Sequence, residues 1–186
     1  MLASAGISVT VVPSEAAEGL LPGEAPAEAA LRLARAKARD VARRTKRAAG
    51  RFVVAADTMV VLDGEVLGKP RDSADADRML RRLSGRVHEV ITGFEVFDKE
   101  TGRGVGEVVT TRVEFKPLSA GEIHAYVATG SPFDKAGGYG IQDTAAGMVR
   151  RIEGSYTNVV GLPLAEVVEA LRRLGAIGAP PVASEP

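Results

Sequence analysis

The sequence contains no cysteine and no long uninterrupted run of hydrophobic residues. Without cysteine the chain has no disulfide framework and no thiolate metal site, which fits a reducing cytoplasm. Its apolar runs are much shorter than the roughly 20 residues that a membrane-spanning helix needs. The first residues lack the basic and apolar regions of a secretory signal. We therefore expect a cytoplasmic protein with no membrane partner.

An excess of charge of one sign is also missing, since 24 Lys and Arg residues balance 24 Asp and Glu residues. No global field therefore draws the chain to nucleic acid. The sequence has no Gly-x-Ser-x-Gly motif, so Ser–His–Asp hydrolase chemistry has no support. The two histidines, His88 and His124, lack metal-ligand spacing, and we interpret both as structural. The length of 186 residues suits one α/β domain or two small lobes that share a sheet.

Helix-like and strand-like segments are mixed along the chain without an internal repeat. We expect strands near residues 7–12, 52–62, 65–67, 87–97, 104–115 and 147–152, and helices near residues 27–49, 73–83, 119–128 and 163–174. Because helices accompany at least one long hairpin, the predicted fold is α/β with an elongated mixed β-sheet flanked by helices. We expect a single domain over residues 1–177 and a mobile tail over residues 178–186.

Three local signals support these elements. Pro26 suits the first position of a helix. Asp63-Gly64 is a two-residue hairpin signal. Ser119 and Glu122 have the spacing of a capping box, which predicts a helix start.

The apolar segment Phe52–Leu62 carries one carboxylate, Asp57, in its middle. Apolar residues on both faces are typical of a strand buried in a sheet. An isolated ionised carboxylate in such a strand is costly unless it is paired, hydrogen-bonded or bound to a metal. Asp57 is therefore either a structural residue that caps a bulge or pairs with one buried arginine, or a general base or metal ligand at a cleft.

A lysine interrupts the apolar stripe of the long predicted helix. Leu33, Lys37 and Val41 lie four residues apart and share one helix face. In one interpretation the stem of Lys37 packs against the core and its ammonium reaches water. In the other, the ammonium holds an anion where the helix meets the sheet.

Residues 64–71 invite comparison with a phosphate-binding P-loop. The spacing is one residue short, and Pro70 stands where a Mg²⁺-binding Ser or Thr is needed. The turn still presents Lys69 and Arg71, two cations that suit a polyphosphate. The alternative is a solvated basic turn.

Residues 134–142 are rich in glycine, which lets a backbone approach a ligand closely. Gln142 offers both a donor and an acceptor, which suits the edge of a base. The alternative is a flexible loop without a ligand.

Six ordered motifs together resemble the Maf family of nucleoside triphosphate pyrophosphatases. They are Leu33-Ala-Arg-Ala-Lys37-Ala, Ala56-Asp57-Thr58, Gly64-Glu-Val-Leu-Gly68-Lys69-Pro70, Met79-Leu-Arg-Arg-Leu-Ser-Gly85, Asp134-Lys135-Ala-Gly-Gly-Tyr-Gly-Ile-Gln142, and Gly154-Ser-Tyr156 with Val160-Gly-Leu-Pro-Leu164. The resemblance covers residues 2–174. It implies the fold of inosine triphosphate pyrophosphatases, with two lobes and a cleft.

The resemblance also implies a reaction, the hydrolysis of dTTP or UTP, or of modified pyrimidine nucleotides, to a monophosphate and pyrophosphate. Asp57 matches the family's catalytic acid, which activates water. Glu18 matches a position that, with Asp57, lines the metal site, so a divalent cation such as Mg²⁺ or Mn²⁺ is expected.

Four more residues match positions of the family that meet the substrate. Lys37 and Lys69 match positions at the phosphates, and Thr58 and Gln142 match positions tied to substrate choice. The alternative function is a non-catalytic, nucleotide-binding regulator of cell division, as the family's historical name, septum formation protein, suggests. The formation of a homodimer stays open.

The family's pattern opens with a strand and a Ser-x-x-Arg-Arg loop, and neither is present in this sequence. The first residues instead resemble the end of the helix that follows that loop. We therefore expect the natural chain to begin upstream of Met1. Lysines do not replace the bidentate geometry of arginine, so we expect weak or absent catalysis and poor stability from a form that begins at Met1.

Overall fold

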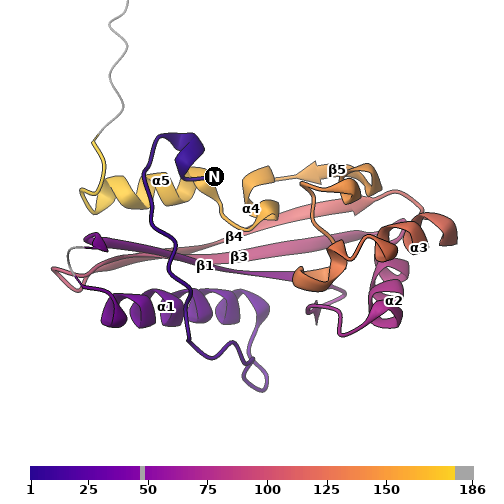
Figure 1. Ribbon diagram of the computed structural model, residues 1–186, viewed down its shortest axis with the longest axis horizontal. Helices are drawn as coiled ribbons and strands as arrows, with labels where there is room; N and C mark the ends of the chain where they lie inside the picture. The colour runs from indigo at the N-terminus through magenta and orange to yellow at the C-terminus, as the bar shows by residue number, and fades with distance from the viewer. Residues whose placement is uncertain (47–48, 179–186) are drawn as a thin grey trace, which may run out of the picture.

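The computed structural model describes residues 1–46 and 49–178 (Figure 1). These residues form a sheet in the order β2-β1-β3-β4-β5, made of β1 (Phe52–Leu62), β2 (Glu65–Leu67), β3 (Val87–Asp98), β4 (Gly104–Phe115) and β5 (Val149–Glu153). The α-helices are α1 (Pro26–Arg44), α2 (Ser73–Leu83), α3 (Ala120–Ala128), α4 (Tyr156–Val160) and α5 (Leu164–Arg173). Short 3₁₀ helices are η1 (Ala3–Ala5), η3 (Ser131–Asp134), η4 (Ala136–Gly138) and η5 (Thr144–Met148). The predicted α/β class, with a sheet flanked by helices, is confirmed.

The sheet differs from the prediction in its strand directions. Each of its four pairings, β1 with β2, β1 with β3, β3 with β4 and β4 with β5, is antiparallel, so the described strands do not form a mixed sheet. Short turns reverse the chain between β1 and β2 and between β3 and β4, and a reversal of this kind gives antiparallel neighbours.

The strand predicted at residues 7–12 does not form. The segment has no assigned helix or strand, and no strand of the described chain pairs with it. Val9 and Val11 are 52% and 87% exposed. The alternation of apolar residues predicted a strand, but a strand needs a partner.

Most of the local signals act as predicted. Asp63 and Gly64 have φ values of 53° and 80°, the positive values that a tight type I′ hairpin requires. Ser119 and Glu122 form both hydrogen bonds of the capping box. Pro26 opens α1, but the helix ends at Arg44, earlier than expected, because Thr45 is extended.

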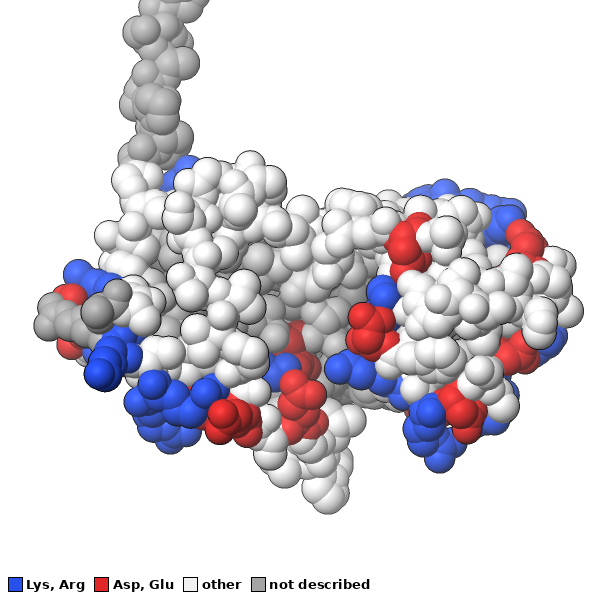
Figure 2. Space-filling view, in the orientation of Figure 1, with Lys and Arg blue, Asp and Glu red and all other residues white. Residues whose placement is uncertain are grey.

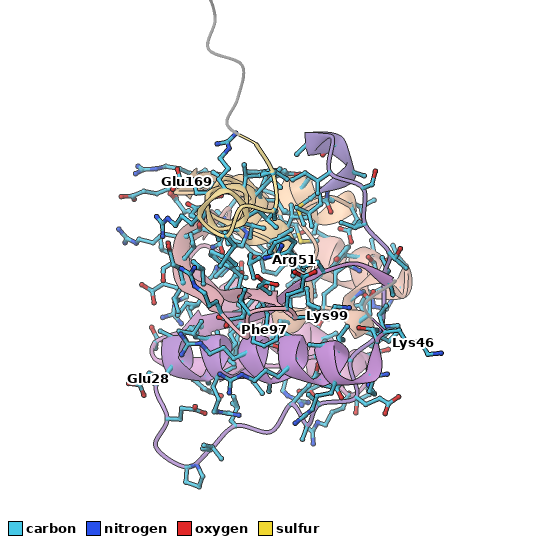
Figure 3. The ribbon with its side chains drawn as sticks, turned by 90° about the vertical axis from the view of Figure 1, so that its left-hand side faces the viewer. Glu28, Lys46, Arg51, Phe97, Lys99 and Glu169 are labelled. Atoms are coloured by element: carbon cyan, nitrogen blue, oxygen red, sulfur yellow. The ribbon has the colours of Figure 1, made fainter. Side chains whose placement is uncertain are left out.

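At one end of the sheet, helices cover both faces of the long strands β1, β3 and β4. The small residues Ala29 and Ala30 bring α1 close to one face, where they form a buried cluster with Leu33, Met59, Val61 and Ile91. On the opposite face α5 packs against β3 through Val167, Ala170, Leu171, Phe94 and Val96. Viewed from the end of the molecule that carries α1 and α5, the sheet lies between α1 below and α5 above (Figure 3).

The far ends of the same strands support a second group of helices. There α2 and α3 pack around a buried cluster that contains Leu80, Phe115, Ile123 and Tyr126. The long strands connect the two ends (Figure 1). No helix among the described residues is long and apolar enough to cross a membrane. Most of the predicted tail, residues 179–186, lies outside the described residues.

Candidate active site

A cavity of about 770 Å³ opens beside the middle of β1. Five consecutive residues, 56–60, line it. Successive side chains of a strand point to opposite faces, so the cavity reaches both faces of the sheet around one edge of β1. β2 pairs only with residues 60–62, so the earlier part of that edge has no neighbouring strand within the described chain. Figure 2 shows a hollow between the two ends of the molecule, with charged groups of both signs along it.

Asp57 points to the α1 face of the sheet, where it meets Lys37. The Lys37 ammonium donates a hydrogen bond to Asp57 Oδ1 at 2.7 Å and lies 2.6 Å from Glu18 Oε1. The side chains of Asp57 and Lys37 are only 13% and 18% exposed. The ammonium therefore does not escape to water. The anions that Lys37 holds at the helix–sheet junction are the two carboxylates, and the partner of Asp57 is a lysine instead of an arginine.

The pKa shifts of this group follow from its contacts. Burial lowers the pKa of Lys37, but the hydrogen bonds to Asp57 and Glu18 outweigh it and raise the pKa above its ordinary value. The hydrogen bond and the charge of Lys37 lower the pKa of Glu18, and Lys69 adds a weaker attraction. Lys37 is thus a fixed cation at neutral pH and has no proton-accepting role there.

The turn after β2 brings Lys69 to the cavity, but not Arg71. Lys69 is exposed and lines the cavity. Arg71 does not line it, because its guanidinium is bound to Asp75 in the first turn of α2, at 3.0 Å. Of the two expected cations, only Lys69 therefore lines the cavity, and Arg71 stabilises the start of α2 through Asp75. Asp75 also accepts from the Arg71 backbone, which fixes the turn.

A glycine-rich loop forms a further wall of the cavity. The Gly137 N–H donates to the Gly68 carbonyl at 3.0 Å and ties this loop to the turn. A Cβ on Gly137 would meet Val60 at 2.8 Å, and its φ of 68° favours glycine. The loop leads to Gln142, which is exposed and lines the cavity.

Sequence reasoning missed how this loop is anchored. Asp143 accepts hydrogen bonds from the hydroxyls of Ser131 and Tyr126 and from the Ala145 N–H. The Lys135 ammonium donates to the Ser131 carbonyl at 2.8 Å. These side chains come from different short segments, so no spacing in the sequence reveals the cluster.

Thr58 points to the opposite face of β1, toward α4. Its Oγ1 lies 2.9 Å from Thr92 Oγ1 on β3 and 3.5 Å from the carbonyl oxygen of Gly161. The cavity is lined by all six residues that the family resemblance assigned to the site: Glu18, Lys37, Asp57, Thr58, Lys69 and Gln142. They come from five separate segments of the chain.

The donor set fits a divalent cation that is shared with a phosphate ligand. The cavity carries four carboxylates, on Glu18, Asp57, Asp134 and Asp143, against the three ammonium groups of Lys37, Lys69 and Lys135. A polyphosphate adds negative charge to a lining that is already negative, so it requires cations. The described residues contain no cluster of three or more metal-ligating side chains. Mg²⁺ commonly binds one or two carboxylates together with substrate phosphates and water, which matches Glu18 and Asp57.

Three similar proteins from other organisms carry the same name. A protein named dTTP/UTP pyrophosphatase from Geotalea uraniireducens is 61% identical over 177 residues, which are 95% of this chain and 90% of that protein. One with the same name from Geobacter sulfurreducens is 60% identical over 95% of this chain and 91% of its own length. A third from Anaeromyxobacter dehalogenans is 50% identical, over 94% and 88%.

One solved structure, a nucleoside-triphosphatase/dITP/XTP pyrophosphatase from Mycobacterium abscessus, is similar at 16% identity and a TM-score of 0.38 over 94% of this chain and 87% of that one. The family model described as Maf-like protein matches residues 1–174. With a match over nearly the whole chain and relatives at 50–61% identity, this chain belongs to the Maf-like protein family.

Proposed function

We propose that this protein is a nucleoside triphosphate pyrophosphatase that converts dTTP and UTP to the monophosphate and pyrophosphate. Pyrimidine triphosphates with a modified base belong to the same proposal. The relatives named dTTP/UTP pyrophosphatase support the substrate class. The observation that carries the proposal for this chain is the meeting of Asp57, Lys37, Glu18 and Lys69 in one cavity that also contains Gln142.

The cavity has a volume that suits a nucleotide. At about 770 Å³ it lies within the range of small-molecule sites. Lys37 and Lys69 in its lining suit the phosphates. Gln142, which also lines the cavity, suits the edge of a base.

Asp57 is the general base in this proposal. Among the described contacts, its Oδ1 accepts from Lys37 and its Oδ2 accepts no hydrogen bond, so Oδ2 is the atom that takes a proton from water. The water oxygen bonds to phosphorus as the α–β anhydride bond breaks, and pyrophosphate leaves. Lys37 orients Asp57, and Lys69 stabilises negative charge on the leaving phosphates.

Glu18 and Asp57 would hold a divalent cation, which would supply charge neutralisation for the phosphates. The chain's own residues keep the two carboxylates near each other, because both contact the same ammonium.

The test of this proposal is pyrophosphate release from a panel of triphosphates with Mg²⁺ or Mn²⁺. We expect turnover of dTTP and UTP by the unaltered chain. Asp57→Asn removes the proton acceptor but keeps the shape, so we expect turnover to fall by about 10²–10⁴-fold. Titration calorimetry with a non-hydrolysable dTTP analogue checks that the variant still binds.

Asp77→Asn is the matched control, because Asp77 lies on α2, pairs with Arg81 and does not line the cavity. We expect this variant to match the unaltered chain. Undiminished turnover by Asp57→Asn would overturn the assignment of the base. Binding of dTTP without any release of pyrophosphate by the unaltered chain would overturn the enzyme and favour the nucleotide-binding regulator.

A further inference from the structure

A chain of buried hydroxyl and amide groups connects the cavity to α4. Thr58 on β1 and Thr92 on β3 lie directly opposite each other in the sheet, with their hydroxyl oxygens 2.9 Å apart. Thr58 lines the cavity, whereas Thr92 and Asn158 are completely buried. The proposed mechanism gives no role to Thr92 or Asn158.

Two backbone carbonyls fix the direction of these hydrogen bonds. The Asn158 carbonyl oxygen lies 3.2 Å from Thr92 Oγ1, and that of Gly161 lies 3.5 Å from Thr58 Oγ1. A carbonyl only accepts, and each hydroxyl has one proton to donate. If Thr92 donates to Asn158, Thr58 must donate to Thr92. If Thr58 donates to Gly161, Thr92 donates to Thr58.

In both arrangements the hydroxyl proton of Thr58 is used inside the protein. While Thr92 keeps its contacts to both Asn158 and Thr58, the Thr58 oxygen therefore faces the cavity as an acceptor. The first arrangement contains the shorter bonds, because the 3.5 Å contact to Gly161 is at the limit for a hydrogen bond. Thr92 is then the group that receives the Thr58 proton.

The acceptor for Thr92 is itself held in place. The Asn158 side-chain amide donates to the Val90 carbonyl at 2.9 Å and to Thr111 Oγ1 at 3.0 Å. The Asn158 N–H donates to Ser155 Oγ, which caps α4. The Asn158 carbonyl thus cannot turn away from Thr92 without breaking buried hydrogen bonds.

We propose that Thr92, held by Asn158, is a positioning residue that keeps Thr58 as an acceptor and so selects nucleotides whose base has a neutral N–H donor at this point. This inference rests on the proposed function. The donor is the imide N–H of thymine or uracil. Cytosine has no imide N–H and presents an acceptor at the same ring atom. When a site presents only a hydrogen-bond acceptor, it discriminates strongly against a ligand that has an acceptor instead of a donor at that point.

The first experiment deletes the donor and the acceptor in turn. Turnover of dTTP, N3-methyl-dTTP and 2′,3′-dideoxy-TTP is compared for the unaltered chain and Thr58→Val. We expect N3-methyl-dTTP to lose about tenfold in kcat/KM with the unaltered chain while 2′,3′-dideoxy-TTP, which keeps the imide N–H, behaves like dTTP. We expect dTTP to lose about tenfold with Thr58→Val. The two losses should not add, because they remove the same hydrogen bond. A steric effect of the N3-methyl group would persist in Thr58→Val.

The second experiment tests Thr92 itself. Thr92→Val keeps the shape but removes the acceptor for the Thr58 proton, which becomes free to donate to a ligand. We expect the kcat/KM ratio of dCTP to dTTP to rise about tenfold, mainly through KM. Thr92→Ser retains the hydroxyl and should restore the original ratio. Thr110→Val, an exposed position on β4 outside the cavity, is the matched control and should change nothing.

The outcomes separate this inference from the proposed function. If dTTP is hydrolysed but N3-methyl-dTTP behaves like dTTP, or the kcat/KM ratio of dCTP to dTTP stays unchanged in Thr92→Val, the positioning role is wrong and the enzyme stands. If no triphosphate is hydrolysed, the enzyme proposal fails. The affinities of the same nucleotides, measured by calorimetry without added metal, then test whether Thr58 acts as an acceptor. If Thr92→Val does not fold, the comparison of Thr58→Val with the two analogues still gives the result.

Discussion

At the scale of single residues, the partly buried charge of Asp57 is stabilised by the charged side chains that lie beside it. Asp57 lies in the middle of an apolar strand, and Lys37 and Glu18 meet beside it. Removing Lys37 or Asp57 would leave the other charge partly buried and uncompensated, which destabilises a protein. The group is therefore part of the fold as well as of the proposed chemistry.

His88 is a buried titratable residue outside this group. Its Nε2 lies 2.7 Å from Tyr139 Oη, and its ring packs edge-on against Tyr139 and Phe115. Burial lowers the pKa of His88 from 6.5 to about 4. Both the hydrogen bond and the packing support the interpretation of His88 as structural.

The pKa of His88 predicts a loss of stability in acid. Between pH 6.5 and about pH 4 the unfolded chain binds a proton at His88 that the folded chain does not, so the free energy of unfolding decreases as the pH falls. The contribution reaches roughly 3 kcal/mol at its largest. His88→Gln cannot titrate, and we expect its free energy of unfolding, measured in urea at several pH values, to fall less over this range.

His124→Gln provides the comparison, because His124 is an exposed histidine on α3. We expect its pH dependence to match that of the unaltered chain. An equally steep loss of stability in His88→Gln would show that His88 does not cause it.

At the scale of secondary-structure elements, one glycine sets how closely α1 approaches the sheet. Gly93 on β3 lies directly opposite Asp57 in the strand pairing. A Cβ at this position would collide with the backbone of Ala30 and Leu31 in α1. The helix therefore packs against bare backbone, and this close contact helps Lys37 to reach Asp57.

Gly93→Ala is expected to push α1 away from the sheet. We expect the free energy of unfolding to fall by about 1–3 kcal/mol, the usual cost of overpacking. Pyrophosphate release should fall as well, because Lys37 shifts relative to Asp57. Thermal unfolding and the turnover assay measure the two effects.

Gly121→Ala is the control for this substitution, since a Cβ on Gly121 in α3 meets nothing closer than 4.0 Å. Alanine favours the helix, so we expect unchanged or slightly higher stability. Equal behaviour of the two variants would contradict the role given to Gly93.

At the scale of the whole molecule, the question is whether the two ends fold as one unit. The buried clusters around α5 and around α2 and α3 lie at opposite ends, but the same strands, β1, β3 and β4, supply residues to both. Unfolding one end would therefore expose the sheet that supports the other. We expect residues 1–177 to behave as a single domain.

Differential scanning calorimetry measures this directly. We expect one transition, with equal calorimetric and van't Hoff enthalpies, as for a two-state domain. Two resolved transitions, or a van't Hoff enthalpy well below the calorimetric one, would show that the two ends unfold separately.

The sequence by itself determined the features that depend on neighbours along the chain. Asp63-Gly64 specified its hairpin, Pro26 the start of α1, and the Ser119–Glu122 pair its capping box. The spacing of Lys37 placed it on the buried face of α1. These signals act within one or two turns of backbone, so a local pattern is sufficient to read them.

Only the tertiary structure decided which of these elements meet. It left residues 7–12 without a partner strand, made every pairing of the described sheet antiparallel, and gave Arg71 to Asp75 instead of to the cavity. It brought Glu18 to Lys37, and Thr92 and Asn158 beneath Thr58. These contacts join segments far apart in the chain, and their geometry depends on how helices and strands pack, which no local pattern of residues records.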